Sequence, residues 1–263
     1  MLVPIFTLNL GQKIHSRRVT IGRYDGQRPC LTAATTAGKV FVHNPHSKAV
    51  EGGRVTTVNT DISLLNVNQQ VSAVCAGRLG GLETDVLVVG TPTNLLAYNV
   101  QDNTDVFYKD VADGVNVLTI GQLGSTTSAL AIAGGNCSLQ GFDYEGNDQF
   151  WTVTGDNVCS LALCDFTGDG QKELLVGSED FDIRVFKEDE IINEMTETEA
   201  ITSICPVYGG RFAYALSNGT VGVYEKTNRL WRIKSKNQAV AFCCYDLNGD
   251  GVPELITGWS NGK

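Results

Sequence analysis

The 263-residue sequence has no run of basic residues, and its 29 Asp and Glu outnumber its 20 Lys and Arg to give a net charge of −9. Nucleic-acid binding needs clustered Lys and Arg, so this composition argues against a nucleic-acid partner. No apolar run approaches the roughly 18–20 residues of a membrane span, so we expect no direct membrane insertion. Met1–Leu10 lacks both the basic region and the long apolar core of a signal peptide.

The eight cysteines form no Cys-x-x-Cys pair. This spacing argues against a zinc site, and a chain of this length does not need the disulfide framework of a short secreted domain. Most of the cysteines lie in apolar, strand-like runs such as Cys159–Cys164. We therefore expect buried, reduced thiols in a cytosolic protein.

Catalytic fingerprints are also absent, since no nucleophile elbow, phosphate-binding loop or dinucleotide motif occurs. The three histidines are His15, His43 and His46. Although two of them share one segment, no carboxylate or cysteine nearby completes a metal site or orients a general base. We predict no enzymatic activity.

Helical periodicity is nearly missing, and the one candidate is Glu188–Met195. A single helical turn would fit this segment, but we interpret it as a loop that leads into an outer strand.

Short apolar strands that end in a small residue recur about every 40 residues, at positions 34, 90, 134, 177, 216 and 258. Each is followed by a polar turn and an alternating strand, as in Asp182–Phe186. This period predicts an all-β fold, a β-propeller with four strands per blade. The wide first interval contains the polar stretch 45–59, which we interpret as a long surface loop.

We predict one domain over residues 1–263. Residues 1–18 would hold a lead-in and a closing strand at Ile5–Leu10, and the blades would span 19–70, 71–113, 114–155, 156–197 and 198–236, with a partial blade at 237–263. This arrangement suggests part of a larger closed ring of seven blades, because closure removes exposed strand edges. The alternative is an imperfectly closed ring of six.

Two nine-residue loops, 165–173 and 246–254, begin 81 residues apart and repeat the same pattern. Each has oxygen-bearing side chains at positions 1, 3, 5 and 9, a glycine at position 6, and a backbone carbonyl available at position 7. Calcium prefers six to eight such oxygen ligands on a tight loop. The predicted ligands are Asp165, Thr167, Asp169, Gln171 and Glu173 in the first loop, and Asp246, Asn248, Asp250, Val252 and Glu254 in the second.

The flanking strands distinguish these loops from helix-loop-helix calcium sites and make them similar to the loops of integrin-type propellers. Gly170 and Gly251 would allow a sharp turn at positive φ. Only Lys172 is near enough in sequence to offset the carboxylates of the first loop. The competing interpretation is that Asp and Asn cap tight turns by accepting backbone N–H groups.

Trp151, Trp231 and Trp259 each lie near the end of a predicted strand. We expect them to pack between blades, with a partner-binding hot spot as the alternative. The acidic stretch Glu188–Glu199 is interpreted as a solvated edge, with docking of a basic partner as the alternative.

Several long runs closely resemble one family. They include Lys39–His46, Trp151–Asn157, Gly177–Glu190 and Leu216–Tyr224. The runs are similar to the N-terminal propeller of the family of the second Bardet–Biedl syndrome protein, a core subunit of the BBSome. The resemblance covers essentially the whole chain.

This resemblance implies a non-enzymatic scaffold in a coat-like complex that carries membrane-protein cargo to and from cilia. The implied partners are sister BBSome subunits and ciliary cargo, and the implied locations are the cytoplasm, the cilium and its membrane, and the basal body. Family members also contain Asp-Gly-rich loops at these two places. The rivals from other classes are a calcium-dependent ligand-binding propeller and a propeller enzyme such as a glycosidase or phytase.

Overall fold

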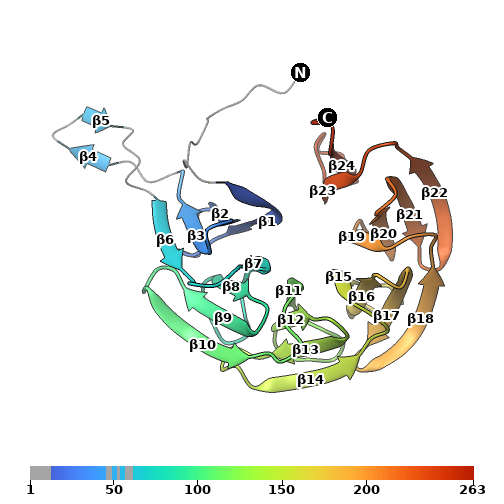
Figure 1. Ribbon diagram of the computed structural model, residues 1–263, viewed down its shortest axis with the longest axis horizontal. Helices are drawn as coiled ribbons and strands as arrows, with labels where there is room; N and C mark the ends of the chain where they lie inside the picture. The colour runs from blue at the N-terminus through green and yellow to red at the C-terminus, as the bar shows by residue number, and fades with distance from the viewer. Residues whose placement is uncertain (1–12, 46–48, 52–53, 57–61) are drawn as a thin grey trace.

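The structure is a computed structural model that describes residues 13–45, 49–51, 54–56 and 62–263. The described residues contain strands and turns but no helix, and five four-stranded antiparallel sheets and one two-stranded sheet surround a common axis (Figure 1). The predicted all-β propeller is therefore confirmed.

Each complete blade is a meander in which consecutive strands pair, except that the fourth strand of the first blade is β6. The strands of the first two blades are β1 (Ile14–Gly22), β2 (Cys30–Thr35), β3 (Lys39–His43), β6 (Ile62–Asn66), β7 (Ala73–Gly77), β8 (Val86–Gly90), β9 (Asn94–Asn99) and β10 (Thr104–Asp110).

The remaining blades follow the same order. Their strands are β11 (Val117–Gly121), β12 (Leu130–Gly134), β13 (Ser138–Phe142), β14 (Asp148–Val153), β15 (Val158–Cys164), β16 (Glu173–Ser178), β17 (Asp182–Lys187), β18 (Glu190–Thr196), β19 (Ile201–Pro206), β20 (Arg211–Leu216), β21 (Thr220–Glu225), β22 (Asn228–Lys234), β23 (Ala239–Tyr245) and β24 (Glu254–Trp259).

The first strand of each blade lies next to the axis and the fourth lies at the rim (Figure 1). The second strands end at or within a residue of the six recurring positions found in the sequence. Their continuous apolar runs are explained by their position, because both faces of a blade contact other blades. In β16, for example, Leu174, Leu175 and Val176 are all fully buried.

Five clusters of buried side chains form the core, and each joins two neighbouring blades. The largest aromatic group lies between the fourth and fifth blades, where the Phe212 and Tyr224 rings stack with centroids 5.5 Å apart. Burial of a large apolar side chain contributes about 1.5–3 kcal/mol to the free energy of unfolding. The buried clusters therefore stabilise the packing of each blade against the next.

Three features differ from expectation. β1 begins at Ile14, inside the segment 1–18 that the sequence analysis assigned to the lead-in. The stretch interpreted as a long loop contains a two-stranded hairpin, β4 (Ala49–Glu51) and β5 (Arg54–Thr56). Segment 188–195 is neither helical nor a loop but mostly strand β18, because it completes the ladder beside β17. The predicted closing strand at Ile5–Leu10 lies outside the described residues.

Candidate metal-binding loops

The first candidate loop joins β15 to β16 at one end of the fourth blade. Its chain direction reverses through Gly168 and Gly170, which have φ angles of 83° and 84°. Glycine adopts this left-handed conformation without steric cost. The predicted turn at Gly170 is confirmed, and Gly251 of the second loop has a φ of 86°.

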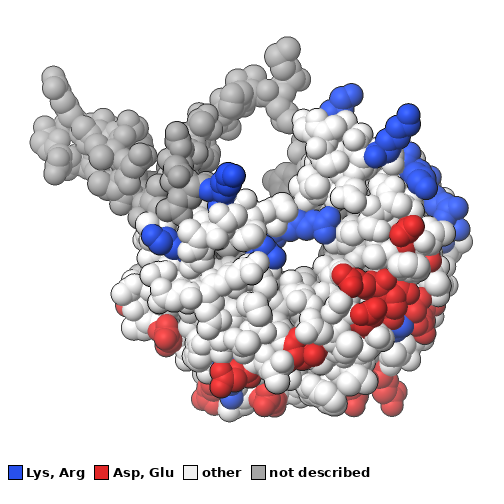
Figure 2. All heavy atoms as spheres, viewed as in Figure 1, with Lys and Arg blue, Asp and Glu red and all other residues white. Residues whose placement is uncertain are grey.

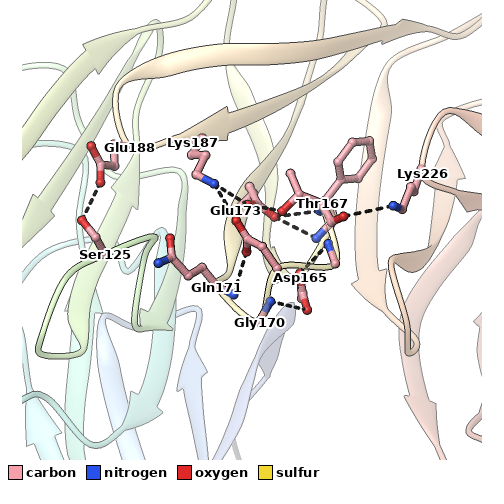
Figure 3. Close-up of polar contacts among 12 residues, drawn as sticks. Ser125, Asp165, Thr167, Gly170, Gln171, Glu173, Lys187, Glu188 and Lys226 are labelled. Carbon is pink, nitrogen blue, oxygen red and sulfur yellow. Dashed lines mark hydrogen bonds and ion pairs between the residues drawn. The ribbon is translucent and has the colours of Figure 1, made fainter.

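The carboxylates of the first loop mostly accept hydrogen bonds from the loop backbone (Figure 3). Asp165 accepts from the Gly168 and Gly170 N–H groups at 2.7 and 3.1 Å. The side chain of Glu173 is fully buried and accepts from the Phe166 and Thr167 N–H groups at 2.8 and 3.2 Å. These bonds correspond to the turn-capping interpretation.

Two lysines from other elements contact this acidic loop, and one of them pairs with its carboxylates (Figure 3). Lys187 Nζ, at the end of β17, lies 2.7 Å from Asp169 Oδ2 and 3.8 Å from Glu173 Oε1. Lys226 Nζ, from the fifth blade, donates to the Thr167 carbonyl oxygen at 3.0 Å. The sequence analysis missed both, because only the folded sheets bring them to the loop.

The second loop, between β23 and β24, repeats the backbone pattern. Asp246 accepts from the Gly249 and Gly251 N–H groups at 2.7 and 2.8 Å, and Glu254 accepts from the Leu247 N–H group at 2.8 Å. Among the described residues, no lysine pairs with the carboxylates of this loop. Instead, Asn248 Nδ2 donates to Asp250 Oδ2 and Glu254 Oε1, both at 3.0 Å.

The titration behaviour follows these contacts. The hydrogen bond from Lys187 lowers the pKa of Asp169, and the same bond raises the pKa of Lys187. In the second loop, the backbone hydrogen bond from Gly251 lowers the pKa of Asp246. The ionised form of Asp169 in the first loop is thus stabilised by an ammonium group, whereas that of Asp246 in the second loop is stabilised by neutral backbone N–H groups.

This difference bears on the predicted calcium ligands. In the first loop the Lys187 ammonium occupies the space between Asp169 and Glu173, which does not fit a calcium ion bound to the same oxygens. In the second loop the group between the carboxylates is a neutral amide. No group of three or more His, Cys, Asp or Glu side chains in the described part of the chain is arranged to hold a metal ion. Calcium occupancy therefore stays a prediction.

Gln171 and Val252 were predicted to offer backbone carbonyls. The structure shows their N–H groups donating to Asp169 and Asp250, at 2.9 and 2.8 Å. These hydrogen bonds fix the side chains of Asp169 and Asp250, which occupy position 5 of the two loops.

The tryptophans correct one expectation. Trp151 on β14 and Trp231 on β22 are 59% and 44% exposed, so they do not pack between blades. Both project outward because they lie on rim strands. Trp259 does pack as expected, against the small cluster between the fifth and sixth sheets.

The acidic stretch is only partly a solvated edge. The side chain of Glu197 is fully buried, accepts a hydrogen bond from the Tyr224 hydroxyl at 2.5 Å, and lies 3.2 Å from Arg229 Nη1. Its position at the end of β18 places it against the fifth blade, which sequence spacing did not reveal.

All eight cysteines are free thiols. Cys137 and Cys243 are exposed, so the expectation of buried thiols holds for only part of the set. His43 ends β3, His15 lies in β1, and His46 lies outside the described residues.

Comparison with known families gives two matches, which together cover most of the chain. Residues 20–121 match the family described as ciliary BBSome complex subunit 2, N-terminal, and residues 160–263 match its middle region.

Individual relatives cover the whole chain. It is 66% identical to BBSome complex member BBS2 of Danio rerio and to that of Homo sapiens, in each case over 100% of this chain. It is 40% identical to bbs-2 of Caenorhabditis elegans over 76% of this chain. The chain spans 38% of the length of the zebrafish relative and 37% of the human one.

Solved structures show the same fold at low identity. A crystal structure of BBS1N in complex with ARL6DN superimposes with a TM-score of 0.75 at 13% identity, over 95% of this chain and 77% of that chain. The Saccharomyces cerevisiae Sqt1 structure gives a TM-score of 0.65 at 12% identity, over 87% of this chain and 66% of that chain.

Proposed function

Because the chain belongs to the family of ciliary BBSome complex subunit 2 and corresponds to the N-terminal part of its members, we propose that it is a non-enzymatic scaffold domain of a BBSome. In this proposal the propeller offers its rim and faces to sister subunits. The assembled coat moves membrane-protein cargo to and from cilia, and the protein works in the cytoplasm and at the cilium, its membrane and the basal body.

The exposure of Trp151 is the observation that carries the scaffold proposal. Its blade has complete blades on both sides, and the side chain is 59% exposed on the rim strand of that blade. Val153 on the same strand is 57% exposed. Trp151 also lines a cavity of about 380 Å³ with Leu123 and Glu188. An exposed tryptophan beside a recess is typical of a binding hot spot.

The architecture also supports this function. Each blade presents a different rim strand on a rigid ring, so one domain can contact several partners at once. The BBS1 N-terminal domain, which shares this fold, was crystallised in complex with an ARL6 protein. Among the described residues no helix has the length and apolarity to cross a bilayer.

We test the scaffold role by substituting Trp151 with alanine in the full-length protein and measuring which BBSome subunits are recovered with it. Loss of a hot-spot side chain costs about 2 kcal/mol or more, so recovery of at least one subunit should fall strongly. The matched control is Tyr108→Ala, because Tyr108 is 55% exposed on the rim strand of the neighbouring blade.

Unchanged recovery with Trp151→Ala would contradict the proposed role of this surface. Unchanged recovery after deletion of the whole propeller would contradict the scaffold proposal itself.

A further inference from the structure

The inner strands of all six sheets meet around a cavity of about 720 Å³ at one mouth of the central channel. Its lining comes from β1, from residues at or near the starts of β7, β11, β15, β19 and β23, and from Asn136 and Glu179 in the turns that follow β12 and β16. Among the described residues that line it, the basic side chains are Arg17 and Arg18. Figure 2 shows basic side chains at the upper edge of the central opening and along the upper right rim, and acidic side chains to the right of the opening and along the lower rim.

Both arginines line the cavity although they are adjacent on β1. Successive side chains of a regular strand point to opposite faces. Here the register of β1 against β2 shifts between Ile14 and Val19, and Arg17 has a φ of 63°. A bulge re-aims side chains, and a non-glycine residue in the left-handed region stores strain. The strained backbone thus places two cationic side chains at one opening.

The two guanidinium groups have different roles. Arg17 reaches across the ring and donates to the carbonyl oxygens of Thr202, Ala239 and Val240, at 2.8, 2.8 and 3.4 Å. The guanidinium group of Arg17 is therefore fixed by backbone carbonyls of the fifth and sixth sheets. Arg18 donates through Nε to the Ser72 carbonyl oxygen at 2.6 Å. Neither Nη atom of Arg18 donates to a protein atom within the described residues.

The positive charge of this pair is not balanced by carboxylates. Arg184, Arg211 and Arg229 each form an ion pair with an acidic side chain, whereas no ion pair among the described residues includes Arg17 or Arg18. Glu179, the carboxylate that the described residues contribute to the lining, accepts a hydrogen bond from the Asn157 amide at 2.9 Å. Desolvation inside the ring lowers the pKa of both arginines, yet a guanidinium group stays charged at neutral pH.

The apolar residues that line the rest of this cavity indicate what kind of anion would fit. Val74, Val117, Val158 and Val240 line the same cavity as the arginines. A carboxylate on an aliphatic stem could bind the Arg18 fork while its methylene groups lie against these valines. The cavity is also large enough for more than a single ion. We propose that this mouth binds an acidic side chain of a peptide segment from a partner protein, with Arg18 as the carboxylate ligand and Arg17 as the positioning residue.

The test measures fluorescence anisotropy of a labelled peptide containing Glu-Asp-Glu against the full-length protein. A peptide with Gln-Asn-Gln in its place, free glutarate and inorganic phosphate are the comparison ligands. Loss of one charge-assisted hydrogen-bonding group costs about 1.5–3 kcal/mol, so Arg18→Gln should weaken binding of the acidic peptide by about 10-fold or more. The matched control, Arg232→Gln, removes an exposed arginine on β22 and should leave binding unchanged.

Arg18→Lys keeps the charge but loses the planar fork, so it should bind more weakly than the wild type and more tightly than Arg18→Gln. This variant also serves if Arg18→Gln does not fold. Equal binding of the acidic and neutral peptides, or equal binding by the wild type and both Arg18 variants, would overturn the proposal. Binding of glutarate or phosphate without binding of the acidic peptide would also overturn it, since a free small anion would then be the ligand.

Discussion

At the scale of single residues, Lys187 shows how one side chain can change the chemistry of a loop. Asp169 and the buried Glu173 would repel each other at close range without a cation. The ammonium group of Lys187 supplies that cation from the third strand of the same blade. The second loop has the same carboxylate spacing but no lysine partner in the part of the chain that the structure describes, so the two loops should differ in affinity for calcium.

We predict that any heat measured on titrating calcium into the full-length protein arises from the second loop. Asp250→Ala should abolish this heat, because it removes a carboxylate that no ammonium group of residues 13–45 or 62–263 neutralises. Asp169→Ala should leave it unchanged, because Lys187 already occupies the first loop. Isothermal titration calorimetry makes this comparison directly. Equal loss with both variants would show that the loops are equivalent, and no heat in the wild type would rule out the calcium proposal.

At the scale of elements, the hairpin turns depend on aspartates that accept backbone N–H groups. Asp25 accepts from Arg28 and Gln27 in the turn after β1, at 2.7 and 2.8 Å, and these bonds lower its pKa. Asp246 uses the same device in the turn between β23 and β24. The ionised form is favoured in the folded state, so each group contributes stability only while it is charged.

The pH dependence has a definite sign. A folded-state pKa below the ordinary aspartate value of about 3.9 contributes stability above that pH, and this stability is lost as the pH falls through the lowered pKa. We expect a constant melting temperature from about pH 7 to 5 and a decline below about pH 4. The Asp25→Asn and Asp246→Asn double variant should show a shallower decline in thermal melts. If the melting temperature of the double variant declined as steeply as that of the wild type, these two turns would not contribute to the pH dependence of stability.

Elements also show where sequence patterns succeed and fail. The short apolar run that ends in a small residue marks β16 and β24 equally well, and both strands form. Their burial differs, however: β16 is fully buried, whereas every residue of β24 is only half-buried. A strand pattern reports local conformation, but burial depends on the sheet that packs against the second face.

At the scale of the whole molecule, Arg17 connects the first blade with the fifth and sixth sheets. Its three donated hydrogen bonds span more than 180 positions of sequence. Because β1 and β23 border the open part of the ring (Figure 1), this side chain links the two ends of the described propeller. A ring of seven blades remains a prediction, and the cross-ring contact does not depend on it.

Arg17→Ala should lower the free energy of unfolding by about 1–3 kcal/mol, because hydrogen bonds from a charged donor are lost. Urea denaturation measures this loss, and hydrogen exchange should show faster opening of β1 and β23. Arg17→Gly should be less destabilised than Arg17→Ala, because glycine accepts a φ of 63° without strain. Equal stability of the wild type and both variants would show that Arg17 does not hold the ring.

The sequence by itself determined the strands, their period and the positions of the acidic turns, because these features depend on local spacing and on residue preferences. It also carried enough resemblance to identify the family. Only the tertiary structure decided that Lys187 reaches the first loop, that Trp151 faces outward and that Glu197 is buried. It likewise placed Arg17 and Arg18 at one mouth of the channel. These contacts join residues distant in the chain, and no local pattern specifies which side chains meet when the blades pack around the axis.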